Sequence, residues 1–447
     1  MTYKNTLVLL MMLVLSWATA QTNPKIYDII DAVSADRLEE DVQQLVDFGT
    51  RNTFSDTLSD SRGIGAARRW IKKEFEQISK ECGGCLEVFY QKKLVTKEMG
   101  SRVPFDTYVV NVVAIQRGKK YPNSFVMMSG DIDSRASDTM NYEIDAPGAN
   151  DNATGMAGAM EAARVLTKYT FDHSVAYVGL SGEEQGLFGG QFLADYAKEN
   201  NWEMIGIFNN DMIGNISGVD GVIDNRSFRI FSEAHNSLET ERDRTMKRYY
   251  GGEVDGSSRQ LARYVHKTTK TYMPEMKPQM IYRLDRFGRG GHHKPFNDVG
   301  FPGIRIMESH ENYNRQHQDI RTENGIEYGD VIEYVNFDYV KKLTAVNAIN
   351  MASLASAPPA PEVVKIGGIV EASVKLEWNE IKDDDLAGYK IYWRDTTSPT
   401  WDNSRFVGDV TEFTLEGIVI DNYYFGVSAV GKNGHESPVV FPNRITR

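Results

Sequence analysis

The sequence has few of the features that would make it a disulfide scaffold or a membrane protein. It contains only two cysteines, Cys82 and Cys85, among 447 residues, which excludes a fold held together by many disulfides. No apolar run after the N-terminal one reaches the roughly 20 residues that a membrane-spanning helix needs. Histidine is scarce as well, and its eight residues leave few candidates for imidazole ligands.

The sequence also lacks an excess of positive charge. Its 50 Lys and Arg residues face 62 Asp and Glu residues, for a formal net charge of -12. This balance argues against nucleic acid as a partner, because phosphate binding needs a basic face. Apolar residues make up 41% and charged residues 25%, as in ordinary soluble globular proteins. The length predicts two to three domains.

The N-terminus has the pattern of a secretory signal peptide. Lys4 precedes the apolar run Leu7–Trp17, and Ala18–Ala20 has the small-x-small form of a cleavage site. We therefore expect residues 1–20 to be removed and the protein to be secreted, into either a periplasm or the extracellular space. An uncleaved anchor is the alternative, but the apolar run is short for one. In an exported chain, Cys82-Gly83-Gly84-Cys85 predicts a small structural disulfide.

The pattern of apolar residues predicts an α/β fold. Three- and four-residue spacing indicates amphipathic helices at Ala35–Phe48 and Arg62–Ser79. Strands are expected at Leu86–Tyr90, Tyr108–Ile115 and Ser124–Ser129. A helix at Asp151–Tyr169, a strand at His173–Ser181, a helix at Gly186–Asn200 and a strand at Met204–Asp211 then alternate. Alternating elements with continuously apolar strands are typical of a largely parallel sheet covered by helices on both faces.

The last part of the chain changes character at a proline-rich segment. A helix at Ser257–Thr271, a strand at Gly303–Met307 and a long helix at Phe337–Ala355 precede residues 357–361, which contain three prolines. Such a spacer commonly marks a domain boundary. Beyond it, short alternating runs at Val374–Trp378, Gly388–Arg394, Glu412–Leu415 and Tyr423–Val430 predict an all-β sandwich. We therefore expect one domain over residues 21–357 and a second over residues 358–447.

Acidic residues recur where the predicted strands end. Asp131 and Asp133 follow one strand, Glu183 and Glu184 follow the next, and Asp211 ends a third. Open α/β sheets bind their ligands at the carboxyl ends of strands, and clustered carboxylates are metal ligands. Each acid taken alone has a simpler reading as a helix cap, a turn residue or a partner of a helix dipole.

Four motifs in a fixed order carry a resemblance to a known family. They are Gly-Asp-Ile-Asp-Ser at 130–134, Pro-Gly-Ala-Asn-Asp-Asn-Ala-Thr-Gly at 147–155, Ser-Gly-Glu-Glu-Gln-Gly-Leu-Phe-Gly at 181–189 and Asn-Asn-Asp-Met-Ile-Gly at 209–214, followed by a late histidine. This order resembles the M28 family of zinc aminopeptidases, over roughly residues 35–355. The resemblance implies a phosphorylase/hydrolase-like α/β fold and two zinc ions.

The resemblance also implies a role for each acidic residue. Asp151 would bridge the two ions, Glu184 would bind one and Asp211 the other, and His317 would be the imidazole ligand in preference to His310. Glu183 would be the general base that activates water for attack on the first peptide bond. From the mechanism rather than from the resemblance, we expect Tyr313, or His292 or His293, to stabilise the oxyanion.

One position departs from the family pattern. The family has His-x-Asp where this chain has Asp131-Ile132-Asp133. Carboxylates also bind zinc, so Asp131 is expected to replace the histidine, which leaves the metal preference at that position open. Asp133, without an imidazole to orient, is expected either to find another donor, such as water or Arg135, or to have a raised pKa.

Several functional alternatives remain open from the sequence. The main expectation is a secreted zinc aminopeptidase that acts on peptides. A metallo-carboxypeptidase is the first alternative, for which Arg289, Arg305 and Arg315 are candidate carboxylate binders. An aminoacylase-like hydrolase and a catalytically dead binding or adhesion protein are the others. The second domain resembles a fibronectin type III domain, around Trp378, Gly388–Trp393 and Tyr423–Val430, which implies contact with a surface or polymer, or a passive stabilising role.

Overall fold

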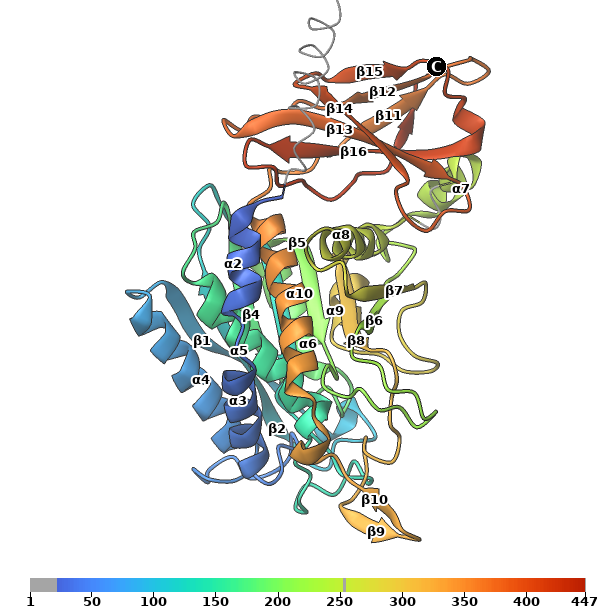
Figure 1. Ribbon diagram of the computed structural model, residues 1–447. Coiled ribbons are helices and arrows are strands. Elements are labelled where there is room, and N and C mark those ends of the chain that lie inside the picture. Colours follow the sequence, from blue (N-terminus) through green and yellow to red (C-terminus); the bar gives the residue numbers. More distant parts are fainter. Residues whose placement is uncertain (1–21, 252–254, 447) are drawn as a thin grey trace, which may run out of the picture.

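The chain forms a large α/β unit followed by a smaller unit built mainly of strands (Figure 1). The computed structural model describes residues 22–251 and 255–446. The predicted signal peptide, residues 1–20, lies outside the described residues. Within the described part of the chain, no helix combines the length and the apolar character that crossing a membrane requires.

The α/β unit is organised around one eight-stranded mixed sheet, in the order β1-β2-β4-β3-β5-β8-β6-β7. Its strands are β1 (Leu86–Val95), β2 (Thr107–Gln116), β3 (Tyr121–Asp131), β4 (His173–Leu180), β5 (Glu203–Asn210), β6 (Ser227–Phe231), β7 (Lys277–Ile281) and β8 (Gly303–Glu308). The four central strands β4, β3, β5 and β8 are parallel, whereas β1, β2 and β6 each form an antiparallel pair. The predicted α/β class is therefore confirmed, with a mixed sheet that is parallel at its centre.

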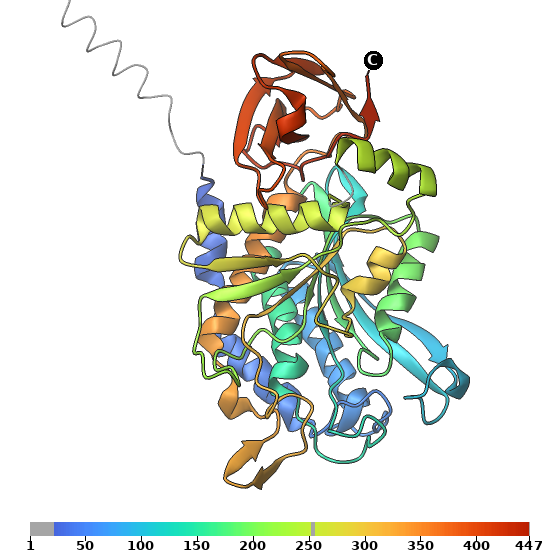
Figure 2. The ribbon, with the colours of Figure 1, turned by 90° about the vertical axis from the view of Figure 1, so that its right-hand side faces the viewer.

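Helices cover both faces of this sheet, as Figures 1 and 2 show. They are α2 (Pro24–Ala32), α3 (Ala35–Asp47), α4 (Gly63–Glu81), α5 (Gly155–Leu166), α6 (Phe188–Glu199), α8 (Ser257–Tyr272), α9 (His293–Asp298) and α10 (Phe337–Ala355), whereas α7 (Glu241–Tyr250) lies beside the smaller unit. Residues of α4, α5 and α10 share one apolar core with the sheet, and residues of α6 and α9 share a second core on the other face. Because both faces are covered, every residue of β4 is buried.

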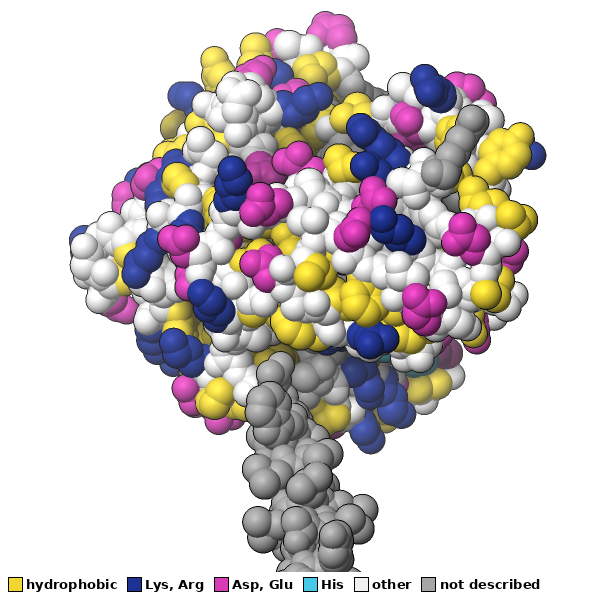
Figure 3. All heavy atoms as spheres, turned by 90° about the horizontal axis from the view of Figure 1, so that it is seen from above, with side chains coloured by type: hydrophobic (Ala, Val, Ile, Leu, Met, Phe, Trp, Pro, Cys, Tyr) yellow, Lys and Arg dark blue, Asp and Glu magenta, His cyan; other side chains and the backbone are white. Residues whose placement is uncertain are grey.

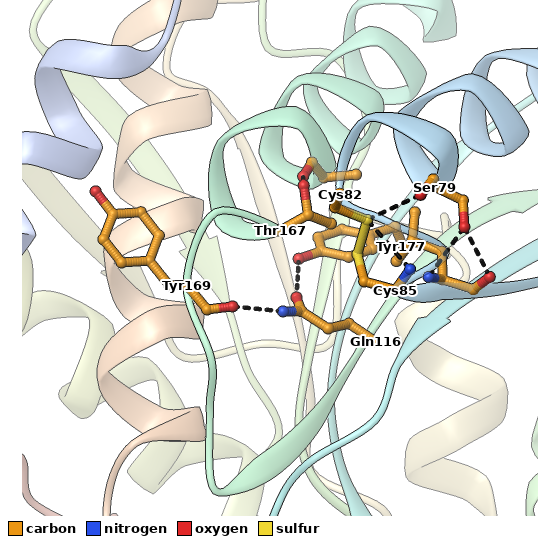
Figure 4. Close-up of a disulfide and its surroundings, with 9 residues drawn as sticks. Ser79, Cys82, Cys85, Gln116, Thr167, Tyr169 and Tyr177 are labelled. Atoms are coloured by element: carbon orange, nitrogen blue, oxygen red, sulfur yellow. Dashed lines mark hydrogen bonds between the residues drawn. A yellow bond between two sulfur atoms is a disulfide. The ribbon is translucent and has the colours of Figure 1, made fainter.

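The predicted disulfide joins Cys82 and Cys85 in the turn between α4 and β1 (Figure 4). Gly83 and Gly84 both have positive φ angles, of 78° and 86°, so glycine is what allows so short a loop. Ser79 holds the other side of the turn, since its hydroxyl donates to the Leu86 carbonyl and accepts from the Leu86 N–H, both at 3.1 Å. The bridge thus fixes the entry into the edge strand.

The smaller unit consists of two sheets. One has the order β15-β12-β11-β17 and the other β14-β13-β16. Its strands are β11 (Val364–Gly367), β12 (Val374–Trp378), β13 (Leu386–Asp395), β14 (Asn403–Gly408), β15 (Glu412–Leu415), β16 (Tyr423–Gly431) and β17 (Arg444–Ile445). One apolar core between the sheets contains Trp378 and Tyr389. The all-β prediction is confirmed, while the resemblance to fibronectin type III stays a prediction.

Buried charges attach the smaller unit to the α/β unit. Arg394 of β13 lies 2.6 Å from Asp255, and Arg263 of α8 binds the other oxygen of the same carboxylate. All three side chains are at most 2% exposed. Removing Asp255 would leave two buried guanidinium groups without their shared carboxylate, which is strongly destabilising. The two units are therefore held in one arrangement.

The outer face of the smaller unit has no dominant charge. Seen from above in Figure 3, acidic and basic side chains are scattered among apolar ones. Contact with a surface or polymer stays a prediction.

Two buried histidines at the junction of the units predict a loss of stability in acid. His173 binds the Ala357 carbonyl through Nε2 at 3.1 Å, and His435 Nε2 accepts from Asn23 at 3.0 Å. Burial lowers the pKa of each imidazole to about 4. The unfolded chain protonates them near pH 6.5, so their contribution is complete above that pH and is lost as the pH falls towards 4.

We expect each histidine to remove about 2 kcal/mol of stability between pH 7 and pH 5. Urea unfolding at several pH values measures this loss. Between pH 7 and pH 5, the free energy of unfolding of His435→Gln should fall by about 2 kcal/mol less than that of the wild type. His235→Gln, at an exposed position, is the matched control and should follow the wild type. An unchanged pH slope in His435→Gln would contradict the assignment.

Candidate metal and catalytic site

The site forms where the parallel strands end. β4, β3, β5 and β8 run in the same direction, so their carboxyl ends meet at one edge of the sheet. That edge carries Asp131 as the last residue of β3, Glu183 and Glu184 shortly after β4, and Asp211 directly after β5. The sequence prediction that strand-end acids gather at one edge is confirmed by this topology.

Three of the five predicted ligands converge on one point. His317 Nε2 lies 2.9 Å from Asp151 Oδ2 and 2.9 Å from Glu184 Oε1. Within the described residues, these three form the one group of metal-ligating side chains whose ligand atoms lie within 4.8 Å of one another. One imidazole nitrogen and two carboxylate oxygens are a donor set that zinc accepts, with a fourth position left for substrate. These three residues therefore fit a zinc ion.

The three side chains also balance one another electrostatically. Burial alone would lower the pKa of His317, but the Glu184 and Asp151 carboxylates raise it to about 9. Burial alone would raise the pKa of Asp151, but the His317 imidazole holds it below its usual range. Two buried carboxylates at this point thus demand a positive partner, which a proton on His317 or a metal ion supplies.

Asp151 is fixed by a buried acid that the sequence reasoning missed. Asp330 accepts the main-chain N–H of Asn150 at 2.8 Å and that of Asp151 at 2.7 Å. Gln316 adds a hydrogen bond to Asp151 Oδ2 at 3.2 Å. Asp151 itself is not helical, with φ -108° and ψ 88°, and α5 begins only at Gly155. The residues predicted to start the helix therefore form a non-helical loop, which directs the Asp151 carboxylate towards His317.

Asn152 ties the same loop to two strands. Its side-chain amide donates to Asp131 Oδ2 at 2.8 Å and to the Asn210 carbonyl at 2.7 Å. Its oxygen accepts from Gly155 at 3.1 Å and from Met212 at 3.3 Å. The side chain is fully buried, so these bonds are protected from water. Asn152 was part of the motif but had no assigned role.

Asp131 and Asp211 do not join the three converging ligands. Asp131 Oδ1 is paired with His292 Nδ1, and its Oδ2 accepts from Asn152. Asp211 Oδ2 lies 2.9 Å from Arg305 Nη2. These two carboxylates have protein partners from distant parts of the chain, so the five-residue ligand set stays a prediction.

Asp133 has found donors that the sequence reasoning did not foresee. Its carboxylate accepts the main-chain N–H groups of Glu183 at 3.3 Å and Glu184 at 3.1 Å. Burial and the neighbouring Asp131 raise its pKa to about 7. Arg135 instead donates to two main-chain carbonyls and lies 3.7 Å from Glu184 Oε2. Asp133 therefore positions the Glu183-Glu184 pair.

Glu183, the predicted general base, faces a cavity of about 370 Å³ beside the three ligands. Burial and the carboxylates of Glu184 and Asp211 hold its pKa well above the usual range. A carboxylate with a raised pKa is a stronger proton acceptor. The cavity is lined by Arg102, Arg135, Asp151, Glu183, Glu184, Asp211, Arg286, Arg289, His317 and neighbouring loop residues.

The candidates for oxyanion stabilisation lie elsewhere. Tyr313 is 57% exposed and is not among the residues that line the cavity. His292 and His293 are fully buried, against Asp131 and the Leu284 carbonyl respectively. His310 binds Asp220 at 2.8 Å, in agreement with the preference for His317 as ligand.

Backbone strain is concentrated around the site. Leu187, Met212 and His317 are not glycines, yet they have φ angles of 63°, 64° and 55°. Each such residue costs on the order of 1 kcal/mol or more, which the surrounding contacts must offset. All three lie in loops at the carboxyl edge of the sheet, and the strain at His317 accompanies the placement of its ring between two carboxylates.

Replacing the buried acid beneath Asp151 tests this architecture. In Asp330→Asn, one acceptor oxygen becomes an NH2 group that faces a main-chain N–H. We expect a loss of about 1–3 kcal/mol of stability and a 10- to 100-fold weaker zinc affinity. Chelator competition and urea unfolding measure the two effects. Asp224→Asn is the matched control, since Asp224 also accepts two main-chain N–H groups but lies outside the site.

Known proteins resemble this chain in sequence. A model of peptidase family M28 matches residues 111–332. A protein from Pyrenophora tritici-repentis named probable zinc metalloprotease is 40% identical over 417 residues, which are 93% of this chain and 86% of that protein. A protein of the same name from Pyricularia oryzae is 38% identical over 413 residues, or 91% of this chain and 82% of that protein.

Solved structures share the fold at lower identity. The LapA aminopeptidase of Legionella pneumophila aligns over 75% of each chain, with a TM-score of 0.53 and 17% identity. The aminopeptidase of Aneurinibacillus sp. strain AM-1 aligns over 74% of this chain and 96% of that one, with a TM-score of 0.50 and 13% identity. These likenesses concern the α/β fold.

Proposed function

The chain belongs to peptidase family M28, among relatives named zinc metalloproteases, and from this premise we propose that it is an aminopeptidase that removes N-terminal residues from peptides. The observation that carries the proposal is the convergence of Asp151, Glu184 and His317 beside Glu183 in one cavity. Two structural neighbours are named aminopeptidases, which supports the choice of substrate end.

Each residue has a role that follows from its surroundings. Asp151, Glu184 and His317 would hold zinc, which supplies Lewis-acid activation of water and of the scissile carbonyl. Glu183 takes the proton of the attacking water and delivers it to the leaving amine. Asp133 keeps Glu183 and Glu184 in place through their main-chain N–H groups. The predicted second ion at Asp131 and Asp211 stays untested, as does the role of Tyr313.

Secretion is part of this proposal. The Cys82–Cys85 disulfide supports it, because disulfides persist in oxidising compartments. The N-terminal signal pattern is the other support.

Adjacent glutamates give a sharp test of the assigned roles. Glu183→Gln should lower kcat by about 10²- to 10⁴-fold and keep its zinc, because only a proton acceptor is lost. Glu184→Gln should lose zinc itself, because a ligand is weakened. The measurements are hydrolysis of aminoacyl nitroanilides and metal analysis of the same preparations. Full activity in Glu183→Gln would refute the mechanism.

A metallo-carboxypeptidase is the second candidate, favoured by the arginines at the cavity. Arg289 is exposed and lines the cavity, as do Arg102, Arg135 and Arg286. A guanidinium binds a carboxylate well, so this group could hold the C-terminal carboxylate of a peptide. Arg305, by contrast, is fully buried and already paired, and Arg315 does not line the cavity.

Blocking each end of one peptide separates the two activities. We expect N-acetylation to abolish hydrolysis and C-terminal amidation to change it little. The reverse result would identify a carboxypeptidase. Arg289→Met should then raise KM for the free carboxylate by about 10- to 100-fold, the value of a lost charged hydrogen bond. Arg321→Met, which removes an arginine outside the cavity, is the control.

A further inference from the structure

The position expected for a second zinc ion is surrounded by groups that already contact both of its ligands, Asp131 and Asp211. Asp211 would supply one ligand, and its Oδ2 lies 2.9 Å from Arg305 Nη2. The Arg305 side chain is 0% exposed and also lies 2.6 Å from Asp285 Oδ2. It further donates to the carbonyls of Asp211 at 3.2 Å and Gly290 at 3.1 Å. Four contacts on a fully buried side chain fix the guanidinium in this place.

Asp131, the other predicted ligand of the second ion, also has a partner for each of its carboxylate oxygens. Its Oδ1 is paired with His292 Nδ1 at 2.5 Å, and its Oδ2 accepts from Asn152 at 2.8 Å. Both oxygens therefore have partners that are themselves buried. In the described ranges of the chain, neither Asp131 nor Asp211 belongs to a group of three or more possible ligands whose ligand atoms all lie within 4.8 Å of one another.

The chemistry of the Arg305 guanidinium explains why it would exclude a second zinc ion. A guanidinium keeps its charge in proteins, so Arg305 cannot make room for a divalent ion by losing a proton. Nor can it swing into solvent, because strand β8 holds it beneath the site. The histidine of the family pattern is also missing at Asp131. These residues do not fit a second zinc ion.

We propose that Arg305 takes the place of a second metal ion, so that the site holds a single zinc ion bound by Asp151, Glu184 and His317. The inference rests on the proposed function for the identity and position of that one ion. Arg305 holds Asp211 on the cavity wall through its ion pair and its hydrogen bond to the Asp211 carbonyl, and His292 and Asn152 hold Asp131. Asp151, which was predicted to bridge two zinc ions, would then bind only one.

The number of tightly bound zinc ions tests the proposal directly. The full-length protein is loaded with zinc and dialysed against a chelator that removes ions bound more weakly than a Kd of about 1 µM. Elemental analysis should find one zinc per chain. Two zinc ions per chain in the wild type would overturn the proposal, whatever the variants show.

Matched variants separate this proposal from the function on which it rests. Asp211→Asn and Asp131→Asn should each keep one zinc, with a Kd within about threefold of the wild type. His317→Ala should lose it, with affinity lowered 100-fold or more. Thermal unfolding checks that each variant is folded. Zinc lost from Asp211→Asn would overturn the single-ion proposal, whereas zinc retained by His317→Ala would instead refute the assigned zinc position.

Discussion

The structure of the site depends on how one sheet edge neutralises its buried carboxylates. Four buried carboxylates, Asp131, Asp133, Glu184 and Asp211, lie there with two partly buried ones, Asp151 and Glu183. Buried like charges raise one another's pKa, so each must be paired, hydrogen-bonded or protonated. The chain supplies a different partner for almost every one. Asp133 takes main-chain N–H groups, Asp211 takes Arg305, and Asp131 takes His292 and Asn152. What remains is the cluster of Asp151 and Glu184 around His317, with Glu183 beside it. Within the described residues, the three side chains around His317 form the one group of three or more possible ligands whose ligand atoms all lie within 4.8 Å of one another.

The central strands and helices could be predicted from the sequence because each of them follows from a local pattern of apolar residues. Continuous apolar runs predicted β3, β4 and β5, and the long periodic helix Phe337–Ala355 has the bounds expected of it. The elements missed were the short ones, such as β7, whose five residues are partly exposed and include Pro278. In the site, the predicted ligands include Asp151, Glu184 and His317, which the structure brings together, while their role as zinc ligands stays a proposal. The partners of Asp131 and Asp211 could not be predicted, since Arg305 and His292 lie far along the chain and carry no motif. Asp330 is likewise a single loop acid whose role appears only once the loop at Asn150 is folded over it.

The strained backbone of His317 shows how contacts between distant segments determine the structure of the site. A left-handed backbone at His317 is unfavourable for a histidine, and nothing in the local sequence requires it. The conformation is maintained because the imidazole gains two carboxylate partners at 2.9 Å. A polar side chain aimed at buried charges thus overrides the preference of its own backbone. The site is therefore specified by electrostatics between distant segments, while the sheet only brings their ends to the same edge.

The position of the smaller unit limits what it can do for catalysis. Tyr121 and His173, at the starts of β3 and β4, face it, and Tyr121 donates to Asp383 at 2.9 Å. It therefore packs at the amino ends of the strands, opposite the edge that carries Glu183 and His317. Its attachment through Asp255 places three charged side chains out of water, so separating the units would leave those charges unpaired. A unit fixed at the far edge in this way cannot close over the cavity as a lid. Its contribution must come through the stability of the α/β unit or through contacts that its own outer face makes.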